Sequence, residues 1–335
     1  MENFWESPRW TKENGEARRV GFELEFSHLS IDRCAEVVQQ ELGGSVNTAH
    51  TFLLHIMDSK IGPLKVELDS TILLALSSMV ENSTKEGQPI AQFSSWLRAA
   101  TRLTGDVSRL LVPVEIATSP LQFEEFSVLE DLKRALRQAG AHGTQRSFLN
   151  AFGLHLNPEL PSHDIDTILN YLRAFLILYP WLKHSLNVDL ARRLLTYINP
   201  FPATYVRKVL NESYQPTLAE FTEDYLTHNP TRNRALDLLP LLTYLDDSVK
   251  ERLSTKEQGL LKPRPTLHYR LPNCSIDEEN WTIAREWNHW VIVERLASDP
   301  ATLTTYLPRC IELLDINPLQ REAAWVEEIQ KLLDL

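Results

Sequence analysis

Acidic side chains recur at every second position inside segments that are otherwise apolar, and this pattern constrains the fold more than any other feature of the chain. Glu23 and Glu25 alternate with apolar residues in GFELEF, and Glu67 and Asp69 repeat the spacing in KVELDS. Residues two apart in a strand point to the same face, so each pair marks one face of a strand. Glu115 lies within a third apolar run, LVPVEIATSPL. The pattern predicts a β-sheet with several carboxylates on one face.

A histidine and an amide extend this pattern. His155 and Asn157 are two apart in GLHLNPE, a segment typical of another strand. Acids are depleted in strands, and they are seldom buried unless they are paired or bind a cation. If the strands are neighbours, several carboxylates gather with the histidine on one face, and like charges at that density need a cation or a proton. A ligand set rich in oxygen and without cysteine suits Mg²⁺ or Mn²⁺.

Each of these residues also has a structural interpretation. An acidic pair in a strand is often the solvent-facing side of an antiparallel sheet. His155, on an apolar strand, is also typical of a core histidine whose ring nitrogens are hydrogen-bonded. The metal-site hypothesis therefore depends on the joint occurrence of the acids in separate strands.

Two compositional regimes divide the chain near residue 160, with no Gly/Ser-rich linker between them. After a polar segment over 1–18, the first half (19–160) alternates strands and helices, and the second half (161–335) is mainly helical. Strands are predicted over 19–28, 51–57, 64–69, 112–118, 147–157 and 265–273. Helices are predicted over 31–42, 91–110, 122–138, 163–186, 189–196, 203–212, 217–226, 279–297, 300–313 and 320–334. Hairpins mixed with helices favour an α+β fold, and we expect one continuous catalytic-type domain over 19–335.

The charge balance and the cysteines narrow the class of protein. The chain has 34 Lys and Arg against 45 Asp and Glu, a formal net charge of −11, so nucleic acid is not expected as a main partner. Three distant cysteines predict a reducing compartment without a disulfide framework. The N-terminus lacks an apolar signal region, and no apolar run is long enough to span a membrane. We therefore expect a cytoplasmic protein without a membrane partner.

Basic residues supply a complement to the acids. Arg270 lies in the strand-like HYRL, where it would face a substrate carboxylate, a phosphate or a structural ion pair. Arg192 and Arg193 belong to a helical stretch, and Arg232 and Arg264 lie in TRNR and KPRP. The sequence contains no P-loop, dinucleotide fingerprint, zinc-protease motif or serine elbow. Neither P-loop phosphate binding nor hydrolysis by a serine nucleophile is therefore supported.

Four of these segments, taken in order, resemble a known family. The run GEARRVGFELEFSHLS, followed by KVELDST, VEIATSPL and FGLHLNPEL, resembles the putative amidoligase family, a relative of glutamate–cysteine ligase and glutamine synthetase among carboxylate–amine ligases. The family's series is strand-ExE, strand-ExD, strand-E-x-x-[ST]-P and strand-G-x-H. The resemblance spans about residues 15–160 and resumes at TRNRALDLLPLL and RPTLHYRLPN.

This resemblance implies a glutamine-synthetase-like α+β fold, in which helices cover an antiparallel sheet and its concave, acidic face holds ATP and divalent cations. The metal ligands that it implies, with Glu67 added as a residue that would tune the cations, are Glu23, Glu25, Glu67, Asp69, Glu115 and His155. Arg270 and Glu115 are expected to act in catalysis, and Arg270 matches an arginine that binds phosphate or substrate. The further nucleotide contacts that we expect are Arg192, Arg193 and Asn157.

Two positions depart from the family's pattern. Asn157 stands where a second histidine or an acid is expected after the G-x-H motif, and His268 stands where an acid is expected two residues before Arg270. An asparagine still offers an amide oxygen to a cation but carries no charge. Each departure would weaken one metal site or change the substrate site.

The function that the resemblance implies is an ATP-dependent carboxylate–amine ligase with an acyl-phosphate intermediate and Mg²⁺ or Mn²⁺ as cofactor. Its substrates would be a small-molecule carboxylate and an amine, the latter free or part of a peptide or protein. Two alternatives stay open, a guanidino or amine phosphotransferase and a non-catalytic nucleotide- or partner-binding protein of the same fold. The sequence does not determine the oligomeric state.

Overall fold

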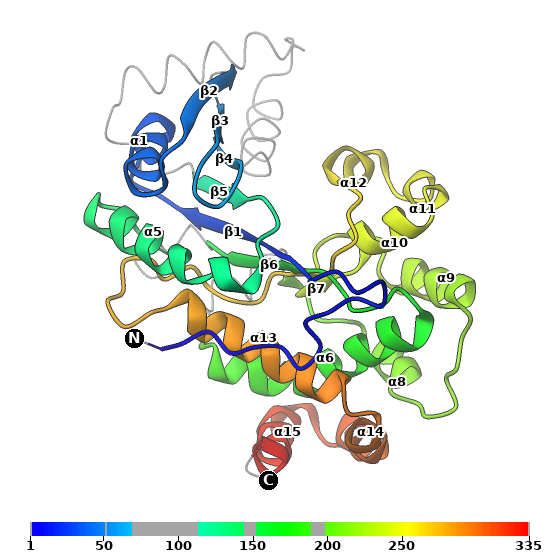
Figure 1. The fold of residues 1–335 in the computed structure, drawn as a ribbon. Helices are drawn as coiled ribbons and strands as arrows, with labels where there is room; N and C mark the ends of the chain where they lie inside the picture. Colours follow the sequence, from blue (N-terminus) through cyan, green and yellow to red (C-terminus); the bar gives the residue numbers. More distant parts are fainter. Residues whose placement is uncertain (1, 51, 69–112, 144–151, 189–197, 334–335) are drawn as a thin grey trace, which may run out of the picture. The chain divides into compact units, whose positions relative to one another are not determined.

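The computed structural model describes residues 2–50, 52–68, 113–143, 152–188 and 198–333 (Figure 1). These residues form two units by their contacts, and each unit is built from discontinuous segments. One, here called the β-rich unit, comprises Gly21–Leu154 and Asn273–Trp281. The other, here called the helical unit, comprises Met1–Val20, His155–Pro272 and Thr282–Leu335. The fold class is α+β, as the sequence predicts.

Antiparallel strands in the order β2-β3-β4-β5-β1 form the sheet of the β-rich unit. Their bounds are β1 Val20–Phe26, β2 Ser45–His50, β3 Leu53–Met57, β4 Leu64–Leu68 and β5 Val114–Thr118. Four of these strands match predicted segments, and the predicted hairpin is the pair β3–β4. Strand β2 was not predicted because its sequence, SVNTAH, lacks a regular apolar alternation and is positioned by its pairing with β3.

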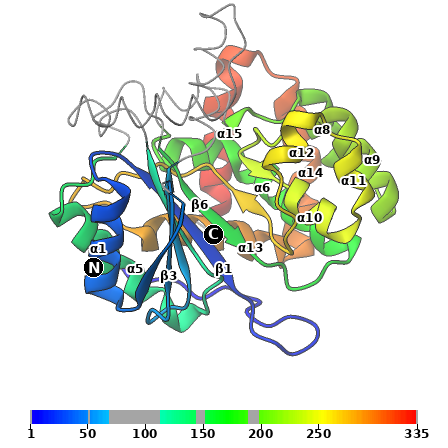
Figure 2. The same ribbon diagram turned by 90° about the horizontal axis from the view of Figure 1, so that it is seen from above.

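The two faces of this sheet differ in chemistry. Phe22, Leu24 and Phe26 on β1 are fully buried, whereas Glu23 and Glu25 between them are half-buried. Helices α1 (Ile31–Leu42) and α5 (Ser127–Gln138) pack together, and α1 packs on strands β2 to β4. Figures 1 and 2 show both helices on one side of the strands. Burial of alternate apolar side chains under helices thus fixes which face carries the acids.

Local signals at both ends explain why helix α1 has the predicted bounds. The Ser30 hydroxyl accepts a hydrogen bond from the Arg33 amide at the helix start (3.2 Å), which satisfies a backbone donor that has no partner within the helix. Gly43 follows the last helical residue with φ of 73°, a conformation that costs a residue with a Cβ more than it costs glycine.

Helix α6 (Ile165–Ser185) is central to the helical unit. Helices α13 (Ile283–Ala297), α14 (Pro300–Leu314) and α15 (Pro318–Leu333) pack against it. The shorter helices of this unit are α8 (Ala203–Val209), α9 (Leu218–His228), α10 (Leu239–Leu245), α11 (Ser248–Glu251) and α12 (Thr255–Leu260). Strand β8 (His268–Tyr269) pairs antiparallel with both β6 (Leu154–Pro158) and β7 (Leu236–Asp237). The last three predicted helices correspond to α13, α14 and α15, while β7 and α10 to α12 were not predicted.

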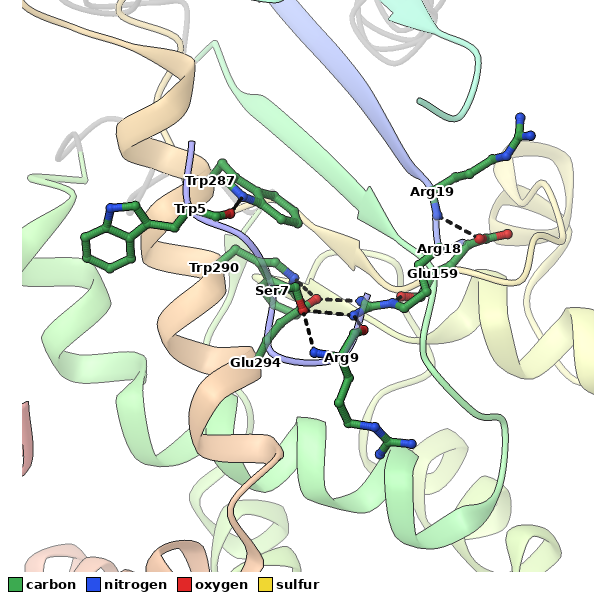
Figure 3. Close-up of polar contacts among 9 residues, drawn as sticks. All are labelled: Trp5, Ser7, Arg9, Arg18, Arg19, Glu159, Trp287, Trp290 and Glu294. Atoms are coloured by element: carbon green, nitrogen blue, oxygen red, sulfur yellow. Dashed lines mark hydrogen bonds and ion pairs between the residues drawn. The ribbon is translucent and has the colours of Figure 1, made fainter. Parts of the chain in front are cut away.

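The N-terminal segment is held against helix α13 by a buried ion pair (Figure 3). The Arg18 guanidinium donates to both carboxylate oxygens of Glu294, at 2.9 and 2.6 Å, and neither side chain is exposed. The Ser7 hydroxyl and the indole N–H of Trp290 donate to the same carboxylate. Burial alone would lower the pKa of Arg18, but the paired Glu294 carboxylate raises it. The charges of this contact are therefore neutralised within the chain.

Several predictions lie outside the described residues, namely the helices over 91–110 and 189–196 and the first part of the strand over 147–157. The three cysteines are buried thiols. Within the described ranges, every helix is too short or too polar to cross a lipid bilayer.

Candidate functional site

Three glutamates form a row across adjacent strands of the β-rich unit. Glu115 on β5 lies directly opposite Glu25 on β1, and on its other side it lies opposite Glu67 on β4. Directly opposed residues of antiparallel strands share a face, with their Cβ atoms about 4.5–5.5 Å apart. All three side chains are half-buried. We call Glu25, Glu67 and Glu115 the acid row.

Hydrogen bonds with Gly153 fix the position of Glu25 within this row. The Glu25 carboxylate accepts from the Gly153 amide at 2.7 Å, and the Glu25 amide donates to the Gly153 carbonyl at 3.1 Å. Glu23 is two residues before Glu25 on the same face of β1, opposite Ala117. The structure thus brings Glu25, Glu67 and Glu115 together as register neighbours, with Glu23 on the same face.

Two buried histidines lie together in the helical unit. The rings of His155 on β6 and His268 on β8 are 5.1 Å apart and nearly perpendicular, and each offers a ring nitrogen within 4.8 Å of the other. Asn157 lies beside them, with its amide oxygen 2.7 Å from Nδ1 of His268. The two departures from the family's pattern, Asn157 and His268, are therefore in contact with each other.

The same ring nitrogen of His268 has a second neighbour. An Arg264 guanidinium nitrogen lies 2.9 Å from His268 Nδ1. One ring nitrogen accepts a hydrogen bond when it lacks a proton and donates one when it carries a proton, so it cannot serve Arg264 and the Asn157 oxygen together. The tautomer of His268 consequently decides which of the two contacts is a hydrogen bond.

Arg270 lies immediately after β8 and is half-buried. Its guanidinium donates to the Arg232 carbonyl at 2.8 Å, and its amide donates to the Ala235 carbonyl at 2.9 Å. Nearby, the Arg232 Nε lies 3.6 Å from the carboxylate of Asp237, which is fully buried. Arg270 therefore belongs to a group of arginines around one carboxylate.

Burial raises the pKa of Asp237 to about 6, although Arg232, Arg270 and Arg264 act in the opposite direction. Arg232 and Arg264 lie in basic segments for which the sequence predicts no role, and Asp237 was not predicted as a site residue. The signal was present, since Asp237 lies in the apolar run ALDLLPLL in the same way as Glu115 lies in its run. Asp69, Arg192 and Arg193 lie outside the described residues.

Comparison with known proteins establishes the family. A family model described as "Putative amidoligase enzyme" matches residues 16–292, and the chain therefore belongs to this family. Neither a search of curated proteins nor a search of solved structures found a match. Membership in this family supports a ligase activity. It also implies that the substrates are small molecules, without identifying them.

The acid row suits a hard divalent cation by its chemistry. Three carboxylates at opposed positions supply oxygen ligands of the kind that Mg²⁺ and Mn²⁺ take in proteins. Like charges directly opposite each other destabilise a sheet, and a bound cation offsets that repulsion. The residues present therefore fit the cations that the sequence predicts.

Proposed function

We propose that this protein is an ATP-dependent carboxylate–amine ligase that works through an acyl phosphate. The observation that supports it most is the acid row of Glu25, Glu67 and Glu115 in a chain of the amidoligase family. Activation of a carboxylate by ATP concentrates negative charge at the phosphoryl group, and cations and arginines must offset that charge.

The proposed roles follow the sequence prediction. The residues proposed to hold Mg²⁺ or Mn²⁺ are Glu23, Glu25, Glu67, Asp69, Glu115 and His155. Bound cations would supply positive charge against the phosphate oxygens. Arg270 is proposed to bind the transferred phosphoryl group or the substrate carboxylate. Arg192, Arg193 and Asn157 are proposed as nucleotide contacts.

The reaction needs no covalent enzyme nucleophile. A carboxylate oxygen of the substrate attacks the γ-phosphorus of ATP, and ADP leaves with the electron pair of the broken P–O bond. The amine nitrogen then attacks the carbonyl carbon of the acyl phosphate, phosphate leaves, and the nitrogen loses a proton. Such a reaction depends on carboxylates for cations and on arginines for anions, and this chain supplies both.

Hydroxylamine trapping tests the proposal. The wild-type protein would be incubated with ATP, Mg²⁺, hydroxylamine and a pool of carboxylates, and hydroxamate and ADP would be measured. We expect both products in the wild type and a strong loss of both in Glu115→Gln, with Glu36→Gln on the exposed side of α1 as the matched control. If the protein binds Mg²⁺-ATP but forms no hydroxamate, ADP or amide, the phosphotransferase is favoured. If it binds no nucleotide, the non-catalytic binding protein is favoured.

A further inference from the structure

Asp237 has an unusual environment for a buried carboxylate. Its side chain is fully buried, and one oxygen accepts from the Leu239 amide at 2.9 Å. The other oxygen makes no hydrogen bond within the described part of the chain. A buried polar atom without a hydrogen bond costs free energy, so the charges around this oxygen must offset part of that cost.

The nearest cation to that second oxygen is Arg232, whose Nε also makes no hydrogen bond among the described residues. The two atoms are 3.6 Å apart, beyond hydrogen-bond distance but close enough for strong attraction in a dry environment. The other end of the Arg232 guanidinium donates to the Leu260 carbonyl at 2.6 Å. The side chain of Arg232 is thus held between Asp237 and Leu260.

A hydrogen bond links Arg232 to Arg270. The Arg270 guanidinium donates to the carbonyl of Arg232, and Arg270 and Arg264 both interact electrostatically with Asp237. Strand pairing places Asp237 directly opposite His268, two residues before Arg270. Arg232, in the loop that precedes β7, and Arg270, immediately after β8, therefore lie around the carboxylate of Asp237 on β7.

We propose that Asp237 is a positioning residue, which holds the guanidinium groups of Arg232 and Arg270 in a fixed orientation for an anionic group of the substrate. The binding of a substrate anion by Arg270 rests on the proposed function. The orientation of the two arginines by Asp237 does not depend on it. Arg232 is assigned to the anion-binding residues together with Arg270. The observations behind this assignment are the single backbone hydrogen bond of Asp237 and the arginines that surround its second oxygen.

The first test measures orientation without any ligand. In protein labelled with ¹⁵N-arginine, the Nε–H signals of Arg232 and Arg270 are assigned by their loss in Arg232→Lys and Arg270→Lys. We expect both signals to exchange with water at least about tenfold more slowly than those of exposed arginines, and Asp237→Asn to abolish that protection. Unchanged protection of both signals in folded Asp237→Asn would overturn the proposal. Asp237→Ser is the replacement if the asparagine variant does not fold.

The second test uses the hydroxamate assay and a double-mutant cycle. Asp237→Asn is expected to lower kcat/KM at least about tenfold in the wild-type background and to have no further effect in Arg270→Lys, because it acts through that residue. Independent, additive losses would overturn the proposal. If the wild type forms no hydroxamate, the proposed function fails, and the signals of Arg232 and Arg270 still decide the role of Asp237.

Discussion

Glu294 and Asp237 are two acids of the same unit with the same burial and opposite surroundings. Both side chains are fully buried. Glu294 receives hydrogen bonds from Arg18, Ser7 and Trp290, which together occupy both of its oxygens (Figure 3). Asp237 receives one backbone hydrogen bond and lies 3.6 Å from its nearest arginine nitrogen.

This difference in hydrogen bonding distinguishes Glu294, whose charge is structural, from Asp237, whose charge we assign to function. A buried ion pair with complete hydrogen bonding fixes how segments dock, here residues 1–20 against α13. A buried carboxylate with an incomplete set costs stability, and its retention is explained when it serves a neighbouring site. Four predictions test this comparison.

The largest effect is expected for Glu294→Gln. The substitution keeps the shape but removes the charge that neutralises Arg18, and it leaves a guanidinium buried without a counter-ion. We expect the free energy of unfolding to fall by about 3–5 kcal/mol at pH 7. Urea denaturation measures this free energy of unfolding. A loss below about 1 kcal/mol would show that Glu294 is not a structural charge and would contradict its distinction from Asp237.

Arg270→Lys is expected to separate activity from stability. The lysine keeps the charge but loses the planar fork, so transition-state binding should weaken by about 2–4 kcal/mol while folding changes little. Steady-state hydroxamate formation and urea denaturation of the same preparation measure the two quantities. Equal losses of stability and activity would show that Arg270 is a structural residue like Arg18.

The free energy of unfolding should depend on pH because Asp237 has a raised pKa. Burial raises its pKa from 3.8 to about 6, so the folded state binds this proton more tightly than the unfolded state. The cost of the ionised group is therefore full above about pH 7 and declines as the pH falls through about 6 and then below 3.8. Relative to Asp237→Asn, the wild type should gain roughly 2 kcal/mol of unfolding free energy between pH 7 and pH 4. A constant difference between the two proteins over this range would contradict the assignment.

The smallest effect is expected for Trp290→Phe. The indole N–H donates to Glu294 at 2.7 Å, and phenylalanine keeps most of the buried surface but removes this donor. We expect a loss of about 1–2 kcal/mol, since Arg18 and Ser7 still donate to the carboxylate. Combining the substitution with Glu294→Gln should give less than the sum of the two losses, because both act on one network.

Regular patterns made the sheet of the β-rich unit predictable. The alternation around Glu23 and Glu25 predicts strand β1 and its two faces, and Ser30 with Gly43 marks the ends of α1. Short elements without a periodic pattern, such as β2 and β7, were missed because pairing with a neighbouring strand defines them. The register of Glu115 against both Glu25 and Glu67 also depends on that pairing.

Contacts between distant segments were beyond sequence reasoning. Asn157 and His268 were recognised as separate departures from the family's pattern, but 110 intervening residues hide that they touch. Asp237 was not predicted because its apolar run, ALDLLPLL, lies in the mainly helical half and has no strand-like alternation. Its importance follows from the arginines that the fold places around it.

Mn²⁺ binding tests the central claim, that the acid row holds divalent cations. Calorimetric titration would compare the wild type, Glu115→Gln and the control Glu36→Gln, whose carboxylate pairs with Arg33 at the surface. Glu115 lies between Glu25 and Glu67, so its loss should weaken Mn²⁺ binding by at least about tenfold. The metal-free variant should unfold no earlier than the wild type, because one of the opposed like charges is gone. Equal Mn²⁺ affinity in the wild type and Glu115→Gln would contradict the account.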